Sequence, residues 1–344
     1  MAKKIIGITA IVAALGFASY GYADYQATAK VKKDLDQVAA DINKSGQGDL
    51  SYEAVKVSLL TEDVVIRNAR FTPNDPSEAV MQIAKLTFSD MVLAEGQQLP
   101  TKMKIDMTDA VITVNNVDAL LGDMDSLQRA ITAEVLNVEN NTAVINYNAQ
   151  LGYELNPVLS LLDIYSNYDA EGMAASDFSI QFANMPTLDA EIMNAAISSG
   201  DTAQALQQQQ LFAAFSDTSL KQLTLSLQDK GLAHKIYTAI AQDPKVSETL
   251  REQGDEASAD TVRNIILQEL DKEISRKQGS SHQLELELLT HAREFLASDN
   301  PGMALTLTAL KPEGLTFTDI LMLVMMGGHP DIANKMVKLD IQTH

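Results

Sequence analysis

A long run of alternating residues between positions 143 and 155 limits most strongly what this chain can fold into. In AVINYNAQLGYEL, apolar residues and tyrosines occupy the odd positions, and mostly polar residues occupy the even ones. A period of two places successive side chains on opposite faces of a β-strand. Such a strand would be about 44 Å long at ~3.4 Å per residue, well beyond the usual length. The pattern therefore predicts one long strand with an apolar and a wet face.

The same alternation recurs between about residues 46 and 182. In KMKIDMTDAVITV, which begins at Lys102, apolar and polar residues alternate in the same way. Further strand candidates are 50–60, 63–71, 83–93, 130–138 and 177–183. The tripeptide ENN, between 130–138 and the long strand, predicts a hairpin. Strands with one apolar and one wet face are typical of antiparallel sheets, so the segment predicts a meander of long strands.

After Pro186 the pattern changes to helical segments. Helices are predicted in 187–215, at 232–242, 260–276 and 282–297, and strands at 220–231 and 337–343. The stretches 223–232 and 305–315 resemble each other, and each predicts a strand, a polar turn ending in Gly-Leu, and a helix. The strongly apolar LMLVMM at 321–326 predicts a buried helix.

Together these patterns predict an α+β fold with a long curved antiparallel β-sheet meander, packed with a helix-rich C-terminal half, after an N-terminal transmembrane or signal helix. The expected domains are a signal anchor or signal peptide, a helical extension, an antiparallel β-rich region, and a helix-rich α+β region closing the sheet. Their expected ranges are 1–23, 24–45, 46–185 and 186–344.

The N-terminus predicts where the protein works. Lys3 and Lys4 precede nineteen uncharged residues, 5–23. That length suffices to cross ~30 Å of hydrocarbon, and it also fits a signal peptide with small residues at a cleavage site. Both interpretations place the chain from Asp24 onward outside the cytoplasm. Apolar residues continue at helical spacing from 31 to 42, which favours a single-pass inner-membrane anchor with a periplasmic domain over a soluble periplasmic protein.

Composition narrows the range of partners. The formal net charge of −20 argues against nucleic acid, whose phosphates require Lys and Arg, and against adhesion to anionic lipid by charge alone. The chain has no cysteine, so no disulfide holds the fold. The inner membrane is the expected partner of the N-terminal helix.

The sequence carries no catalytic motif. It contains no P-loop, Gly-x-Gly-x-x-Gly, His-Glu-x-x-His or Gly-x-Ser-x-Gly pattern. His282 and His291 are nine residues apart, which places them on opposite faces of a helix. They are therefore poorly placed to bind the same metal ion. Asp123 and Asp125 lack the other ligands of a calcium loop. We therefore expect no enzyme activity, cofactor or metal.

The apolar faces of the long strands are the best candidate for a binding site. Aromatic residues make up only 5% of the chain, which leaves little bulk to fill the space above these faces. Partial cover would leave a trough with an apolar floor, a shape that holds acyl chains. The residues expected on this floor are Ile105, Met107, Ile145, Tyr147 and Leu151.

A family resemblance adds to this interpretation. After the N-terminal helix and an Ala-rich extension, GDLSYEAVKVSLLTEDVVIRNARF at 48–71 resembles the opening of AsmA-like and YdgA-like envelope proteins of Gram-negative bacteria, including the Asn-x-x-aromatic pattern from Asn68 to Phe71. The segments 223–243 and 295–323 resemble modules of uncharacterised bacterial periplasmic proteins. The resemblance implies long β-sheets and, for AsmA-like members, a role in envelope lipid homeostasis or transport. This chain departs from it by being short and by its helix-rich second half.

The predicted function is that of a non-enzymatic, periplasm-facing protein of the cell envelope that binds lipid or another apolar ligand in a β-trough. The alternative is a membrane-anchored structural or interaction module whose acidic wet faces meet an envelope protein partner.

Overall fold

The computed structural model describes most of the chain from Ala27 onward. The described residues are 27–44, 46, 48–58, 61, 63–75, 78–93, 100–122, 124–186, 216–278, 283–299, 301–325 and 335–343. The predicted N-terminal anchor and the helices predicted in 187–215 lie outside them. None of the helices that can be described is long and apolar enough to span a membrane.

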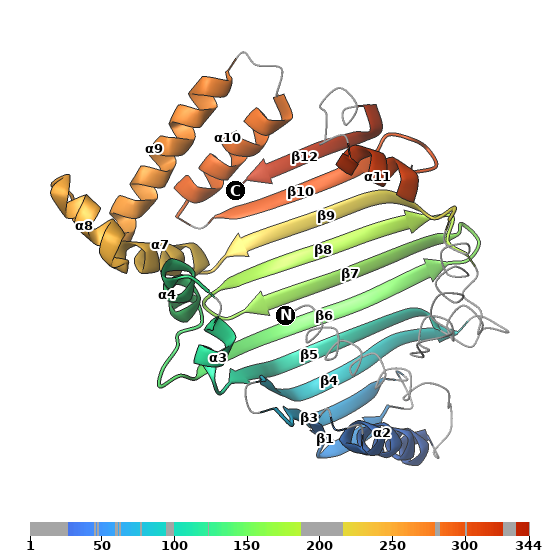
Figure 1. The fold of residues 1–344 in the computed structure, drawn as a ribbon. Helices are drawn as coiled ribbons and strands as arrows, with labels where there is room; N and C mark the ends of the chain where they lie inside the picture. Colours follow the sequence, from blue (N-terminus) through green and yellow to red (C-terminus); the bar gives the residue numbers. More distant parts are fainter. Residues whose placement is uncertain are drawn as a thin grey trace.

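A large, open, curved antiparallel sheet dominates the structure and confirms the predicted α+β class (Figure 1). The strand order is β1-β3-β4-β5-β6-β7-β8-β9-β10-β12, with β2 paired to β3 and β11 paired to β9. The strands are β1 (Gly48–Ser51), β2 (Ala54–Val57), β3 (Val64–Pro73), β4 (Val80–Leu93), β5 (Pro100–Val114), β6 (Ala143–Asn156), β7 (Leu161–Ala170), β8 (Ala174–Ala183), β9 (Ser219–Asp229), β10 (Gly302–Ala309), β11 (Leu315–Thr316) and β12 (Val337–Thr343).

The described helices gather at the margins of this sheet. They are α2 (Ala27–Lys44), α3 (Val117–Leu121), α4 (Ser126–Val135), α7 (Leu232–Gln242), α8 (Pro244–Glu252), α9 (Ala259–Lys277), α10 (Gln283–Ala297) and α11 (Phe317–Met325). In Figure 1, α2 lies beside β1, α7 to α10 lie toward one end of the strands, and α11 lies toward the other end.

The two faces of the sheet differ in chemistry, because cross-strand partners in an antiparallel ladder share a face. We call them the apolar face and the polar face. One row on the apolar face runs from β3 to β12 through Val64, Phe88, Ile105, Leu151, Ser166, Phe178, Leu225, Leu305 and Ile341. The neighbouring row on the polar face runs from β4 to β12 through Thr87, Asp106, Gln150, Asn167, Asp177, Ser226, Ala304 and Gln342.

The main core lies between α2 and the first strands of the sheet. Val31 and Leu35 of α2 are buried in the same cluster as Leu50 of β1 and the apolar face of β3 to β6. The helix is amphipathic, so its charged residues stay in water while this stripe packs inward. The side-chain carbonyl of Asn43, near the end of α2, accepts a hydrogen bond from the backbone N–H of Leu50 at 2.7 Å. This bond joins the helix to the first strand.

The two similar stretches of the second half form the same local structure. β9 leads through Gly231 into α7, and β10 leads through Gly314 toward β11 and α11. Gly231 has a φ of +116° and Gly314 a φ of +94°, values that favour glycine. A Cβ on Gly314 would lie 2.8 Å from the carbonyl oxygen of Leu220. The predicted strand, turn and helix are found in both copies, but in the second the two-residue strand β11 lies between the turn and the helix.

The predicted strand at 130–138 is wrong, because residues 126–135 form helix α4. The carboxylate of Asp125 accepts a hydrogen bond from the backbone N–H of Gln128 at 2.8 Å and caps the first turn. An N-cap of this kind satisfies amide groups that a helix start leaves without partners. The alternation in AITAEVLNV is compatible with a strand and also with a short helix. The N-cap formed by Asp125 favours the helix.

Candidate ligand-binding face

The apolar face is covered in its first half and open in its second. In β3 to β6, which we call the sealed half, Ile66 is 1% exposed and Leu86 and Phe88 are 0% exposed. In β7 to β12, which we call the open half, Ile164 is 37% exposed and Leu225 is 45% exposed. Leu315 of β11 is buried, at 2% exposed, but further large side chains of the open half are partly exposed, among them Phe178, Ile180, Leu223, Leu227, Leu305, Leu307, Leu339 and Ile341.

The five residues predicted for the trough all lie on the apolar face. The register pairs Ile105 with Leu151, and odd positions of β6 place Ile145 and Tyr147 on the same side as Leu151. Ile105, Met107 and Tyr147 belong to the packed core, whereas Ile145 and Leu151 are partly exposed. All five thus lie in the sealed half, and three of them are buried. Contact of these residues with a ligand stays a prediction.

Tyr147 and Tyr168 mark the border between the two halves. Their ring centroids lie 5.2 Å apart across β6 and β7. Burial, with a smaller contribution from Tyr168, raises the pKa of the Tyr147 hydroxyl to about 12. Burial also raises the pKa of Tyr168. Both hydroxyls are therefore partly desolvated at this border.

The sequence reasoning missed the residues of the open half. Phe178, Leu225 and Leu305 occupy the same row as Ile105 and Leu151. All three segments alternate in sequence and were predicted as strands. The signal that could have identified these residues was the phase of that alternation. That phase indicates which residues share a face once the strands are paired.

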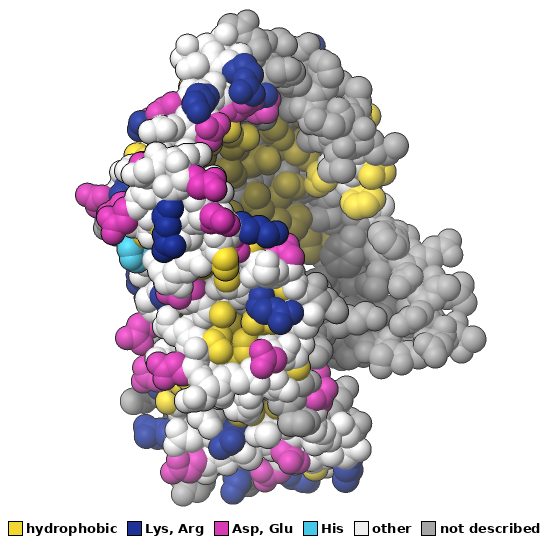
Figure 2. All heavy atoms as spheres, turned by 60° about the vertical axis from the view of Figure 1, so that its left-hand side comes forward, with side chains coloured by type: hydrophobic (Ala, Val, Ile, Leu, Met, Phe, Trp, Pro, Cys, Tyr) yellow, Lys and Arg dark blue, Asp and Glu magenta, His cyan; other side chains and the backbone are white. Residues whose placement is uncertain are grey.

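A hollow with a hydrophobic floor opens toward the end of the sheet that carries α7 to α10 (Figure 2). At this end the apolar face closes into a cavity of about 230 Å³, which we call the apolar cavity. It is lined by Ala174, Leu227 and Asp229 of the sheet, by Leu232, Ala233, Ile236 and Tyr237 of α7, and by Phe295 and Leu296 of α10. Leu227 continues the open half, because it follows Leu225 on the same face of β9.

A second, polar pocket of about 140 Å³ adjoins the apolar cavity. The two share Asp229, Ala233, Tyr237 and Leu296. The polar pocket is further lined by His234, Asp260, Arg263, Ser298, Asp299 and Pro301. Tyr237 therefore stands between an apolar and a polar space.

The hydroxyl of Tyr237 is buried and has no hydrogen-bond partner among the described residues. The residue as a whole is 7% exposed. Burial raises the pKa of this hydroxyl, the charge of Arg263 opposes the rise, and that of Asp229 adds to it. Both charged residues line the polar pocket, and Asp229 lines the apolar cavity as well.

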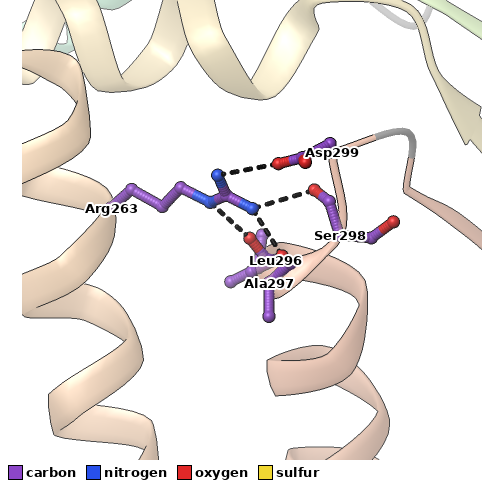
Figure 3. A network of polar contacts seen from close by, with 5 residues as sticks. All are labelled: Arg263, Leu296, Ala297, Ser298 and Asp299. Atoms are coloured by element: carbon purple, nitrogen blue, oxygen red, sulfur yellow. Dashed lines mark hydrogen bonds and ion pairs between the residues drawn. The ribbon is translucent and has the colours of Figure 1, made fainter.

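Arg263 is already engaged by the end of α10 (Figure 3). Its Nε donates to the carbonyl oxygen of Leu296 at 2.8 Å, and its Nη2 donates to those of Ala297 at 2.6 Å and Ser298 at 2.9 Å. Its Nη1 lies 3.5 Å from a carboxylate oxygen of Asp299. The last carbonyls of a helix lack intrahelical partners, and a cation there is favourable. Arg263 thus fixes α10 against α9.

Exposed apolar side chains also gather at the opposite end of the sheet. Leu321 is 46% exposed and Met322 is 45% exposed, so the prediction that this part of 321–326 is buried is wrong. The side chains from Leu323 onward in that run lie outside the described residues. Strand pairing and connectivity place the following exposed residues at the same end: Val92, Val158, Leu159, Leu310, Phe317, Leu321 and Met322.

Within the part of the chain that the structure describes, no group of three or more His, Asp or Glu side chains is placed to hold a metal ion. Nδ1 of His291 lies 3.2 Å from a carboxylate oxygen of Glu294 and 3.5 Å from the hydroxyl of Thr343. His282, His329, His344 and Asp123 lie outside the described residues.

A protein-family model matches the second half of the chain. Residues 167–344, just over half of the chain, match the model of a protein family described as "Uncharacterized protein". The match begins inside β7 and takes in the rest of the open half, the apolar cavity and the polar pocket. No curated protein matches the chain.

Proposed function

The chain belongs to this family of uncharacterised proteins, and we propose that it is a non-enzymatic protein of the cell envelope that binds lipid or another apolar ligand. The observation that carries the proposal is the open half of the sheet. There the apolar face continues from β7 to β12, and most of its large side chains remain partly accessible to water.

Contiguous exposed apolar surface is unfavourable in water and marks a binding site more often than chance. A flexible acyl chain suits a long, narrow apolar strip, because each methylene removed from water contributes ~0.8 kcal/mol. Part of this gain is offset by the lost freedom of the bound chain. The hollow and the apolar cavity give the strip the concave shape that ligand sites share.

The envelope location is supported by Lys3 and Lys4 before the uncharged segment 5–23. In this proposal the segment anchors the chain in the inner membrane and leaves the sheet in the periplasm, close to a source of lipid. A phosphatase fused after residue 344 is expected to be active. A well-expressed but inactive fusion would exclude this orientation.

The binding proposal is tested by lipid mass spectrometry on the full chain purified in mild detergent. We expect co-purified phospholipid, fatty acid or glyceride at a defined stoichiometry. Leu225→Asp should reduce this load, because it places a charge on the open half. Gln222→Asp is the matched control, since Gln222 lies in the same strand and belongs to the polar face.

Absence of lipid from the wild-type protein, or equal loads in the two variants, would contradict the proposal. The structural or interaction module, in which the open half or the acidic polar face meets a protein partner, would then be the better explanation. Thermal unfolding of both variants checks that a reduced load does not reflect loss of the fold.

A further inference from the structure

We infer that the ligand has a polar end without negative charge, which binds in the polar pocket beside Tyr237 while its acyl chain lies in the apolar cavity and along the open half. The chemical class is that of a single-chain lipid ending in hydroxyl groups, such as a monoacylglycerol. This inference rests on the proposed function and specifies its ligand.

The two neighbouring pockets match the two parts of such a molecule. The apolar cavity ends at Tyr237, and the polar pocket begins there, because Tyr237 lines both. On the other side the apolar cavity continues into the apolar face through Leu227 of β9. A chain that starts at Tyr237 can therefore follow Leu227 and Leu225 along the open half.

The Tyr237 hydroxyl points to a hydrogen-bonding ligand. It is enclosed and has no partner among the described residues, a situation that native structures rarely leave unresolved. A tyrosine hydroxyl both donates and accepts hydrogen bonds, so it is a suitable partner for a ligand hydroxyl. The unpartnered hydroxyl is an observation independent of the shape of the pocket, and it distinguishes the pocket from a gap between helices.

The charges around the pocket disfavour an anionic end. Asp229 lines both pockets, and Asp260 and Asp299 line the polar one. Arg263 is the one Lys or Arg among the described residues that line this pocket, so three carboxylates face a single guanidinium. The Asp and Arg residues of the lining sum to a formal charge of −2, which opposes the binding of a carboxylate or phosphate. An uncharged hydroxyl group meets no such penalty.

The test is a competition between 1-dodecanoylglycerol and dodecanoate, which have the same acyl chain and differ in the polar end. The full chain in amphipol is incubated with equal concentrations of both at pH 7.5, and bound ligand is measured by native mass spectrometry. We expect the glyceride adduct to exceed the dodecanoate adduct by about tenfold.

Two variants assign this preference to the pocket. Tyr237→Phe removes only the hydroxyl and should lower glyceride binding about fivefold, as expected for one lost hydrogen bond, without weakening dodecanoate binding or lowering the melting temperature. Asp229→Asn keeps an oxygen that can accept from the backbone N–H of Ala233, as Asp229 does at 3.1 Å. It should increase dodecanoate binding.

Each outcome separates this inference from the proposed function. Dodecanoate binding as well as or better than the glyceride would overturn the assignment of the polar end and leave the apolar site intact. An unchanged preference in both variants would overturn the role of the pocket. If neither ligand binds the wild-type chain, the inference and the proposed function both fail.

Discussion

The sealed and open halves of the sheet present the same face and the same residue types, yet only the sealed half forms a core. Phe88 in β4 is 0% exposed, whereas Leu225, in the same transverse row, is 45% exposed. Alternation in sequence therefore shows which side chains share a face. It does not show whether anything packs on them.

The difference arises from what lies above each half. Val31 and Leu35 of α2, with Leu50 of β1, pack into the core of the sealed half. Over the open half, the described helices α7 and α10 meet the apolar face at one end, where they enclose the apolar cavity. A face that is sealed contributes stability, and a face that is open is available for binding.

The largest expected effect comes from truncating one phenylalanine in each half. Phe88→Ala should lower the free energy of unfolding by ~3–5 kcal/mol, because it leaves a cavity in a packed core. Phe178→Ala removes the same atoms from the same row of the open half and should cost only about 1 kcal/mol. Urea unfolding, with the midpoint and slope measured for each variant, checks the difference. Similar losses would mean that both halves are equally covered.

A second, intermediate effect concerns the border residue Tyr147. Its pKa is raised from 10.0 to about 12 in the folded protein, so the unfolded chain releases this proton first as the pH rises. The contribution of the protonated Tyr147 to the free energy of unfolding is fully present below pH 10. It should be lost between about pH 10 and 12, which lowers the free energy of unfolding by roughly 2–3 kcal/mol. Tyr147→Phe cannot ionise and should lack this part of the alkaline loss.

Unfolding free energies of the wild type and Tyr147→Phe, measured from pH 8 to 12, test this expectation. The two curves should separate above pH 10, with the variant falling less steeply. Parallel curves would show that water reaches Tyr147, and the border of the sealed half would then lie before β6.

Much of the fold could be predicted from local patterns. The strand from Ala143 to Asn156, the helix at 232–242 and the strand at 337–343 follow from periodicity, because each is read within a single segment. The turn glycines Gly231 and Gly314 also carry their own signal, since their positive φ angles favour glycine.

The site could be predicted only in part, since it depends on contacts between distant segments. Pairing of β8 with β9 and of β9 with β10 creates the open half, and no single stretch indicates these partners. In the sequence, Tyr237 is an ordinary residue of an amphipathic helix. The burial of its hydroxyl without a hydrogen-bond partner among the described residues depends on α9 and α10. The prediction that the apolar run beginning at Leu321 is buried failed for a related reason. Hydrophobicity predicts a preference for burial but not the presence of another element that packs on the side chain.

The smallest expected effect is the sharpest test of whether the open half is open. Leu225→Thr keeps a good strand former and removes exposed apolar surface, so it should change the free energy of unfolding by less than about 1 kcal/mol. It should nevertheless reduce the fluorescence of a hydrophobic dye bound to the protein, because part of the apolar surface that binds the dye is removed. The control is Thr224→Ser, on the polar face of the same strand, which should leave dye binding unchanged. A loss of several kcal/mol in Leu225→Thr would show that another part of the chain covers this residue in solution. The comparison between the two halves would then fail, and the proposed ligand would have to displace that cover before it could bind.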